Sequence, residues 1–134
     1  MRVQDIPLPV TQPVITSAKP TARYRVNPRF EAALFESIVT PGPIQYSYIM
    51  ALYYAGAAEP CFFVSAELNA DAPADRRGSH ALGLFDEDGH TRLSLSNAWG
   101  DRQQFIREAL SLMSERSAST DAVLWYVGER SAAG

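Results

Sequence analysis

The clearest pattern in the chain is an alternation of side chains between residues 44 and 55. Every second position there carries an apolar or aromatic residue: Ile44, Tyr46, Tyr48, Met50, Leu52 and Tyr54. Because aromatic and β-branched residues favour extended backbone, the segment predicts a long strand rather than a helix. A second strand is predicted over residues 61–68. Its first half is apolar at every position, which indicates a place inside the sheet.

A hairpin is predicted over residues 80–96, around the turn Asp86-Glu87-Asp88-Gly89. Asp-Gly supplies the positive φ that tight hairpin turns require. Strict alternation would place four leucines on one face of this hairpin: Leu82, Leu84, Leu93 and Leu95. Phe85, Arg92 and Ser94 would then lie on the other face.

Two helices are predicted. Asn27 and Pro28 suit the start of the first, as N-cap and first helical residue, and residues 40–43 (TPGP) end it. Its apolar stripe would be Phe30, Ala33, Leu34, Ser37 and Ile38. The second helix is predicted over residues 101–116, capped by Asn97 or Asp101. Its buried stripe would be Phe105, Ile106, Ala109, Leu110 and Met113.

The remaining segments complete a single domain over residues 1–134. Residues 1–22 hold four prolines and are expected to form an extended arm, because proline lacks an N–H and fixes φ. Residues 69–79 are expected to form a polar loop. The apolar run at 122–127 predicts a last strand, and residues 128–134 a frayed tail.

These elements predict an α+β fold with two layers. A mostly antiparallel sheet of about five strands would carry two helices on one face, in the order helix-strand-strand-strand-strand-helix-strand. The second face of the sheet would then be wet, covered by the arm, or covered by a partner.

Charge and composition narrow the function classes. The chain has 12 basic and 15 acidic residues, and its net charge is −3. The basic residues are scattered, so we expect no nucleic-acid binding, which needs a concentrated basic face. No apolar run reaches the ~18–20 residues of a membrane helix. A single cysteine, Cys61, cannot form an internal disulfide. We therefore expect a cytoplasmic protein without a membrane partner.

Candidate catalytic chemistry is sparse, and no motif indicates a metal site or a cofactor. His80 and His90 would lie at opposite ends of the hairpin, roughly 15 Å or more apart at ~3.3 Å per residue. His80 reads more simply as a histidine at the edge of the core, and His90 as a solvent-exposed turn residue. Cys61 with His80 is the one nucleophile–base pair that could form a pocket, but no local feature supports it, and Cys61 reads more simply as a buried, inert cysteine.

Tyrosines are the unusual concentration. Tyr46, Tyr48 and Tyr54 share a strand face with Met50. Tyrosine is enriched at protein interfaces, so this face is a candidate binding surface if the helices leave it open. The alternative is a half-buried central strand.

Two functions follow from these patterns. The first is a bacterial-type, non-enzymatic protein-interaction module of the adaptor, immunity-like or secretion-chaperone-like kind, working as a homodimer or with a protein partner. The second is a small-molecule-binding protein or modest hydrolase, with a pocket between sheet and helices. The first predicts a flat apolar patch, and the second a concave cavity with converging polar groups.

Overall fold

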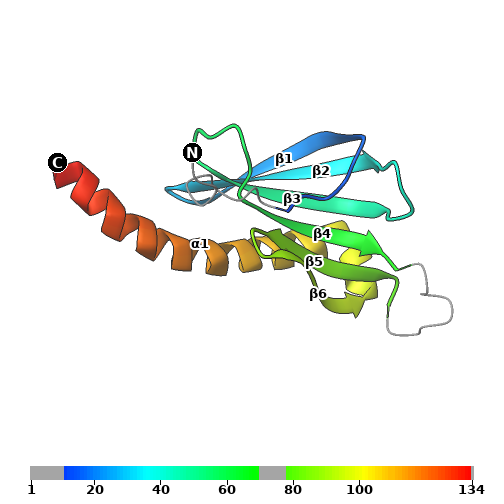
Figure 1. Ribbon diagram of the computed structural model, residues 1–134. Coiled ribbons are helices and arrows are strands. Elements are labelled where there is room, and N and C mark those ends of the chain that lie inside the picture. The colour runs from blue at the N-terminus through cyan, green and yellow to red at the C-terminus, as the bar shows by residue number, and fades with distance from the viewer. Residues whose placement is uncertain (1–10, 70–77, 134) are drawn as a thin grey trace.

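The chain forms one antiparallel sheet followed by one long helix, as a computed structural model shows (Figure 1). The structure describes residues 11–69 and 78–133, with side chains up to Ser117. The six strands neighbour one another in chain order: β1 (Ser17–Asn27), β2 (Phe30–Val39), β3 (Tyr46–Tyr54), β4 (Phe62–Leu68), β5 (His80–Asp86) and β6 (Gly89–Ser96). A short 3-10 helix (Asn97–Gly100) leads into α1 (Arg102–Ala133).

One face of the sheet packs against the first half of α1. Asp101 caps this helix, because its Oδ1 accepts the Gln104 N–H at 3.0 Å. Thirteen buried residues form the core between the two layers: Phe30, Ala32, Leu34, Met50, Leu52, Phe62, Val64, Ala66, Leu82, Phe105, Ile106, Ala109 and Met113. Every second strand residue faces α1, and the helix stripe repeats at three- and four-residue intervals, as the two periods require.

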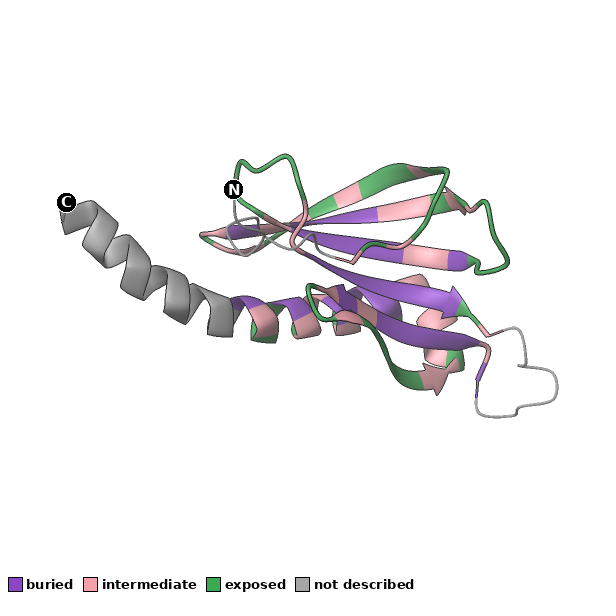
Figure 2. Ribbon diagram, in the orientation of Figure 1, coloured by how far each residue is buried: buried purple, intermediate pink, exposed green. Residues whose placement is uncertain are grey.

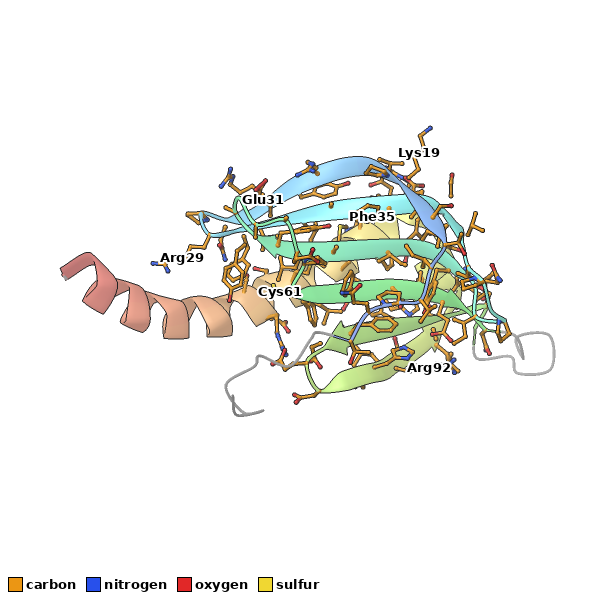
Figure 3. All side chains as sticks on the ribbon, turned by 45° about the horizontal axis from the view of Figure 1, so that its top comes forward. Lys19, Arg29, Glu31, Phe35, Cys61 and Arg92 are labelled. Atoms are coloured by element: carbon orange, nitrogen blue, oxygen red, sulfur yellow. The ribbon has the colours of Figure 1, made fainter. Side chains whose placement is uncertain are left out.

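The opposite face of the sheet carries a second, smaller core and is crossed by residues 11–16, which we call the arm segment. The buried residues of this second core are Tyr46, Ile49, Ala51, Phe63 and Phe85. The backbone N–H of Thr11 donates to the Asp86 carbonyl at 3.0 Å, and that of Thr16 donates to the Val39 carbonyl at 2.7 Å. In Figure 3 the segment passes in front of the strands, with α1 behind them. We call this side the arm face.

The predicted fold is wrong in strand number, helix number and order. Residues 30–39, predicted as the first helix, form β2, and Asn27 caps a turn instead, its Oδ1 accepting the Arg29 N–H at 2.9 Å. Both faces of β2 are covered, so its apolar residues fit a helical period as well as an alternating one. Leu34 faces α1, whereas Ala33 lies on the other side and is also buried.

The predicted strand at 122–127 is also wrong, because α1 continues through it to Ala133. The helix predicted over 101–116 is confirmed as the first half of α1, with four stripe residues buried and Leu110 partly buried. Residues 117–121, which connect the predicted helix to the predicted strand, contain neither proline nor glycine. Nothing in that segment therefore stops a helix that has already formed. The tail predicted from residue 128 likewise lies in α1 up to Ala133.

The predicted hairpin is confirmed as β5 and β6, but one irregularity changes its faces. Leu82 pairs with Ser94 and Gly83 pairs with Arg92, so Leu93 is an extra residue on β6. Leu93 is 45% exposed instead of sharing the face of Leu82. Residues 17–22 of the expected arm belong to β1, whereas residues 1–10 and most of the 69–79 loop lie outside the described residues.

Exposure differs between the middle and the margins of the sheet. Figure 2 shows buried residues concentrated on β2 to β5 and exposed residues on β1 and β6. Within the described part of the chain, no helix combines the length and apolar character that crossing a membrane requires.

Candidate functional site

The four residues of the predicted tyrosine surface do not form one exposed patch. Met50 is fully buried, and Tyr48 stacks on Phe105 of α1 with ring centroids 5.4 Å apart. Tyr54 packs on Phe30 and stays 38% exposed. Tyr46 is 7% exposed and lies on the arm face, because the β3–β4 pairing shifts register between Tyr46 and Tyr48.

Cys61 and His80 lie at opposite ends of β4. Cys61 directly precedes the strand, and His80 pairs with Leu68 at its far end. Seven residues at ~3.3 Å each separate them by roughly 20 Å. The Cys61 Sγ donates to the Leu52 carbonyl at 3.4 Å, and burial raises the pKa of its thiol. The structure therefore does not bring this nucleophile–base pair together.

His80 is buried, and both of its ring nitrogens are satisfied by serine hydroxyls. Ser47 Oγ lies 2.9 Å from Nε2, and Ser79 Oγ lies 2.8 Å from Nδ1. A neutral imidazole has one donor and one acceptor nitrogen, so the two hydroxyls complete it. Burial lowers the pKa of His80. The ring also packs closely on Gly100, where a Cβ would lie 2.7 Å from Cε1, which leaves no room for a substrate on that side.

A polar cluster lies on the arm face, over β4, β5 and β6. The Glu67 carboxylate is 2% exposed, and its Oε1 accepts from the Arg92 guanidinium, whose side chain is 57% exposed. Glu67 Oε2 lies 3.6 Å from His90 Nε2. Oε2 and the Ser65 hydroxyl are buried without a hydrogen-bond partner among the described residues. A buried polar atom without a hydrogen-bond partner is uncommon, so both atoms have hydrogen-bonding capacity that the described residues do not use.

The cluster depends on the absence of a side chain at Gly83. A Cβ there would approach Ser65 Oγ to 2.8 Å and His90 Nε2 to 3.0 Å. Gly83 does not have the positive φ that would by itself explain glycine. Its role is therefore steric, since a glycine inside a strand leaves space for a neighbouring group to approach.

Two cavities flank the arm segment above this face. The larger, about 420 Å³, is lined by Thr11, Gln12, Val14, Pro41, Gly42, Pro43, Ile44, Tyr46, Phe85 and His90. The smaller, about 230 Å³, lies over Phe35, Ile49, Tyr53 and Phe63, and Gln12 borders both. We call the larger one the arm cavity. Its walls are mostly apolar, and His90 and Tyr46 supply polar atoms.

A depression of about 520 Å³ on β6 is larger than the arm cavity but would enclose less of a ligand's surface. Its lining comes from four consecutive residues of one strand, Arg92 to Leu95. A small ligand there would stay largely in water, whereas ligand sites cover most of their ligand's surface. The arm cavity, with walls from the arm segment, the 41–44 turn, β3, β5 and β6, is the better enclosed site.

Sequence reasoning missed this site. The sequence predicts His90 as a solvent-exposed turn residue and gives no sign that Glu67 lies beside it. The available signal was Gly83 inside an apolar strand, which indicates a close approach by another group. Comparisons of the chain with protein-family models, with curated proteins and with solved structures find no match.

Proposed function

We propose that this chain is a non-catalytic binding protein that holds a small, mainly apolar molecule in the arm cavity. The observation that carries the proposal is the cavity of about 420 Å³ between the arm segment and the sheet. Its volume lies within the ~300–1,000 Å³ of typical ligand sites. Its lining combines apolar side chains with a few polar groups, which is the composition such sites share.

The arm segment covers the cavity, and the way it is attached to the sheet supports entry of a ligand. The arm segment crosses the arm face as extended chain, and two backbone hydrogen bonds tie it to the sheet, at Thr11 and at Thr16. Val14 and Ile15 are 71% and 38% exposed, so much of their apolar surface is not used to fill the space beneath. An apolar ligand would gain about 25 cal/mol per Å² of surface that it buries there.

The side chains around the cavity favour binding over catalysis. Among the described residues that line the cavity, His90 supplies the one imidazole, and none is a serine or a cysteine. Nucleophilic catalysis needs a nucleophile within hydrogen-bond reach of a base. Ser65 faces the same space over Gly83 as His90, but no hydrogen bond joins them, and its hydroxyl is buried.

Fluorescence of N-phenyl-1-naphthylamine tests the proposal. This apolar dye brightens in a dry pocket, and we expect saturable brightening with a 1:1 stoichiometry. Ile44→Trp places a large side chain in the cavity wall and should weaken dye binding at least tenfold. Leu68→Trp is the matched control, because Ile44 and Leu68 are both 45% exposed and Leu68 does not line the cavity. Equal weakening by both variants, or no saturable brightening in the parent chain, contradicts the proposal.

A second candidate function, self-association, is favoured by one observation at the sheet margin. No described segment pairs with the outer edge of β6, and Leu93 is 45% exposed there. The opposite edge, β1, contains Lys19 and Pro20 and has three register shifts, all of which oppose strand pairing, whereas β6 contains no lysine or proline and has a single shift, at Leu93. We propose a second copy of this chain as the occupant of the β6 edge, paired antiparallel about Leu93. That register places Arg92 opposite Ser94 of the partner and avoids like charges.

Analytical ultracentrifugation distinguishes the two functions. Self-association through β6 predicts a mass that rises with concentration and a Leu93→Lys variant that stays monomeric. A Leu68→Lys variant, altered at an equally exposed leucine, should associate like the parent chain. A monomer at all concentrations excludes this second function and leaves the arm cavity unaffected.

A further inference from the structure

The ring orientation of His90, one of the polar groups of the arm cavity, is fixed by its packing. Its ring stacks on Phe85 with centroids 4.1 Å apart and an interplanar angle of 3°. Its backbone pairs with Phe85 across β5 and β6. The side chain is 28% exposed and lines the cavity. Because the ring is held in this way, its two nitrogen atoms point in fixed directions.

Glu67 lies on one of those edges. Its Oε2 is 3.6 Å from His90 Nε2, is buried, and has no hydrogen-bond partner among the described residues. The other oxygen, Oε1, is occupied by Arg92. A carboxylate facing one imidazole nitrogen stabilises a proton on that nitrogen and thereby sets the tautomer.

We infer that Glu67 holds a proton on Nε2 of His90, so that Nδ1 is left as the acceptor that recognises the ligand. The inference rests on the proposed function and adds a ligand class to it. The molecule bound in the arm cavity would carry a hydrogen-bond donor, a hydroxyl group in the simplest case, on an apolar body. Glu67 acts through His90 and is a positioning residue.

The charges around His90 favour a neutral donor over an anion. The carboxylate of Glu67 lies behind the imidazole, and the guanidinium of Arg92 is already engaged with that carboxylate. An anionic head group would meet His90 without a free cation in the cluster. An apolar body matches the remaining walls, which include Ile44, Pro43 and Phe85.

Gly83 supplies an independent test of the geometry. A Cβ at this position would lie 3.0 Å from His90 Nε2 and 2.8 Å from Ser65 Oγ. Gly83→Ala therefore pushes on the imidazole edge that faces Glu67, without removing any polar group from the cluster. The variant should change the orientation of His90 while the rest of the cavity wall stays in place.

Three probes share a propylphenyl body and differ in the head group, so they measure what the head group contributes to binding: 4-propylphenol, propylbenzene and 4-propylbenzoate. Titration calorimetry should give about tenfold tighter binding of 4-propylphenol than of propylbenzene, which corresponds to ~1.4 kcal/mol and lies within the range of one hydrogen bond. 4-Propylbenzoate should bind more weakly than 4-propylphenol. His90→Phe, Glu67→Gln and Gly83→Ala should each reduce the advantage of the phenol to less than threefold. Glu36→Gln is the control, since it removes an ion-paired carboxylate outside the cavity lining.

A tautomer measurement separates positioning from a merely structural role. Long-range ¹H–¹⁵N spectra of the imidazole should show His90 protonated on Nε2 in the parent chain. The same spectra of Glu67→Gln should show a mixture of the two tautomers. If Glu67 only stabilised the fold, its replacement would leave the tautomer of His90 unchanged.

The outcomes distinguish the inference from the proposed function. If none of the three probes binds, the arm cavity is not a ligand site and the proposed function fails. If the phenol and propylbenzene bind equally, the proposed function stands and the role of His90 is wrong. A proton on Nδ1 in the parent chain also overturns the inference, whichever probe binds.

Discussion

Glu67 and Arg92 form an ion pair in which the carboxylate is 2% exposed and the guanidinium side chain is 57% exposed. The two residues are 25 positions apart and lie on β4 and β6, with β5 between them. A buried carboxylate is tolerated only when charged or polar partners compensate for its lost hydration. Arg92 therefore neutralises Glu67 from the outer margin of the sheet.

Removing Arg92 tests this dependence. Arg92→Ala leaves the buried Glu67 without its cation and should lower the free energy of unfolding by about 2 kcal/mol, as urea denaturation measures it. The control is Arg102→Ala, because the partner of Arg102, Glu36, is 23% exposed and water can replace the guanidinium. A loss no larger than that of the control would show that Glu67 does not depend on Arg92.

The packing between α1 and the sheet depends on Phe105. Its side chain is fully buried and stacks on Tyr48 of β3. Phe105→Ala should lower the free energy of unfolding by about 3–5 kcal/mol, the range for large-to-small changes in a core. Arg107→Ala, on an exposed position of the same helix, should change it by less than ~0.5 kcal/mol. A small effect of Phe105→Ala in the same urea titration would mean that this half of α1 does not cover the sheet in solution.

Stability should fall in mild acid because of His80. Burial lowers its pKa in the folded state below the ordinary value of 6.5, so below that pH the unfolded chain binds more protons than the folded chain. The stabilisation is fully present above about pH 6.5 and is lost as the pH falls towards the folded pKa. Urea denaturation at pH 7.5 and pH 5.5 should show a smaller loss in His80→Gln than in the parent chain. An equal loss in both proteins would assign the acid sensitivity to other groups.

The single thiol should be slow to react. Burial raises the pKa of Cys61, and its Sγ donates to the Leu52 carbonyl, so little thiolate forms near neutral pH. With 5,5′-dithiobis(2-nitrobenzoate) at pH 8, the folded chain should react at least tenfold more slowly than the chain in 8 M urea. A folded-state rate equal to or above the unfolded rate would reopen a catalytic role for Cys61.

Local signals in the sequence were sufficient for β3 and β4, predicted over residues 44–55 and 61–68, and for two further elements. The turn before Gly89 and the alternation on both sides of it predict the β5–β6 hairpin, because both depend on neighbouring residues alone. Asp101 and the stripe that follows it likewise predict the start of α1. Neither depends on knowing what packs against the element.

The remaining elements depend on tertiary contacts that the sequence does not display. Phe30, Ala33 and Leu34 fit one face of a helix and also the two faces of a strand buried on both sides. The choice between them depends on the arm face being covered. The sequence did not predict the candidate site for a related reason, since Glu67 and His90 come together only after β4, β5 and β6 are paired in register.

Intermolecular nuclear Overhauser effects between 4-propylphenol and the isotope-labelled chain test the central claim most directly. Binding in the arm cavity predicts contacts from the propyl group to the methyl groups of Ile44 and to the rings of Tyr46 and Phe85, which line it. Contacts confined to Leu68 or Leu93, the exposed leucines outside the cavity, would contradict the account. So would the absence of any contact at saturating probe.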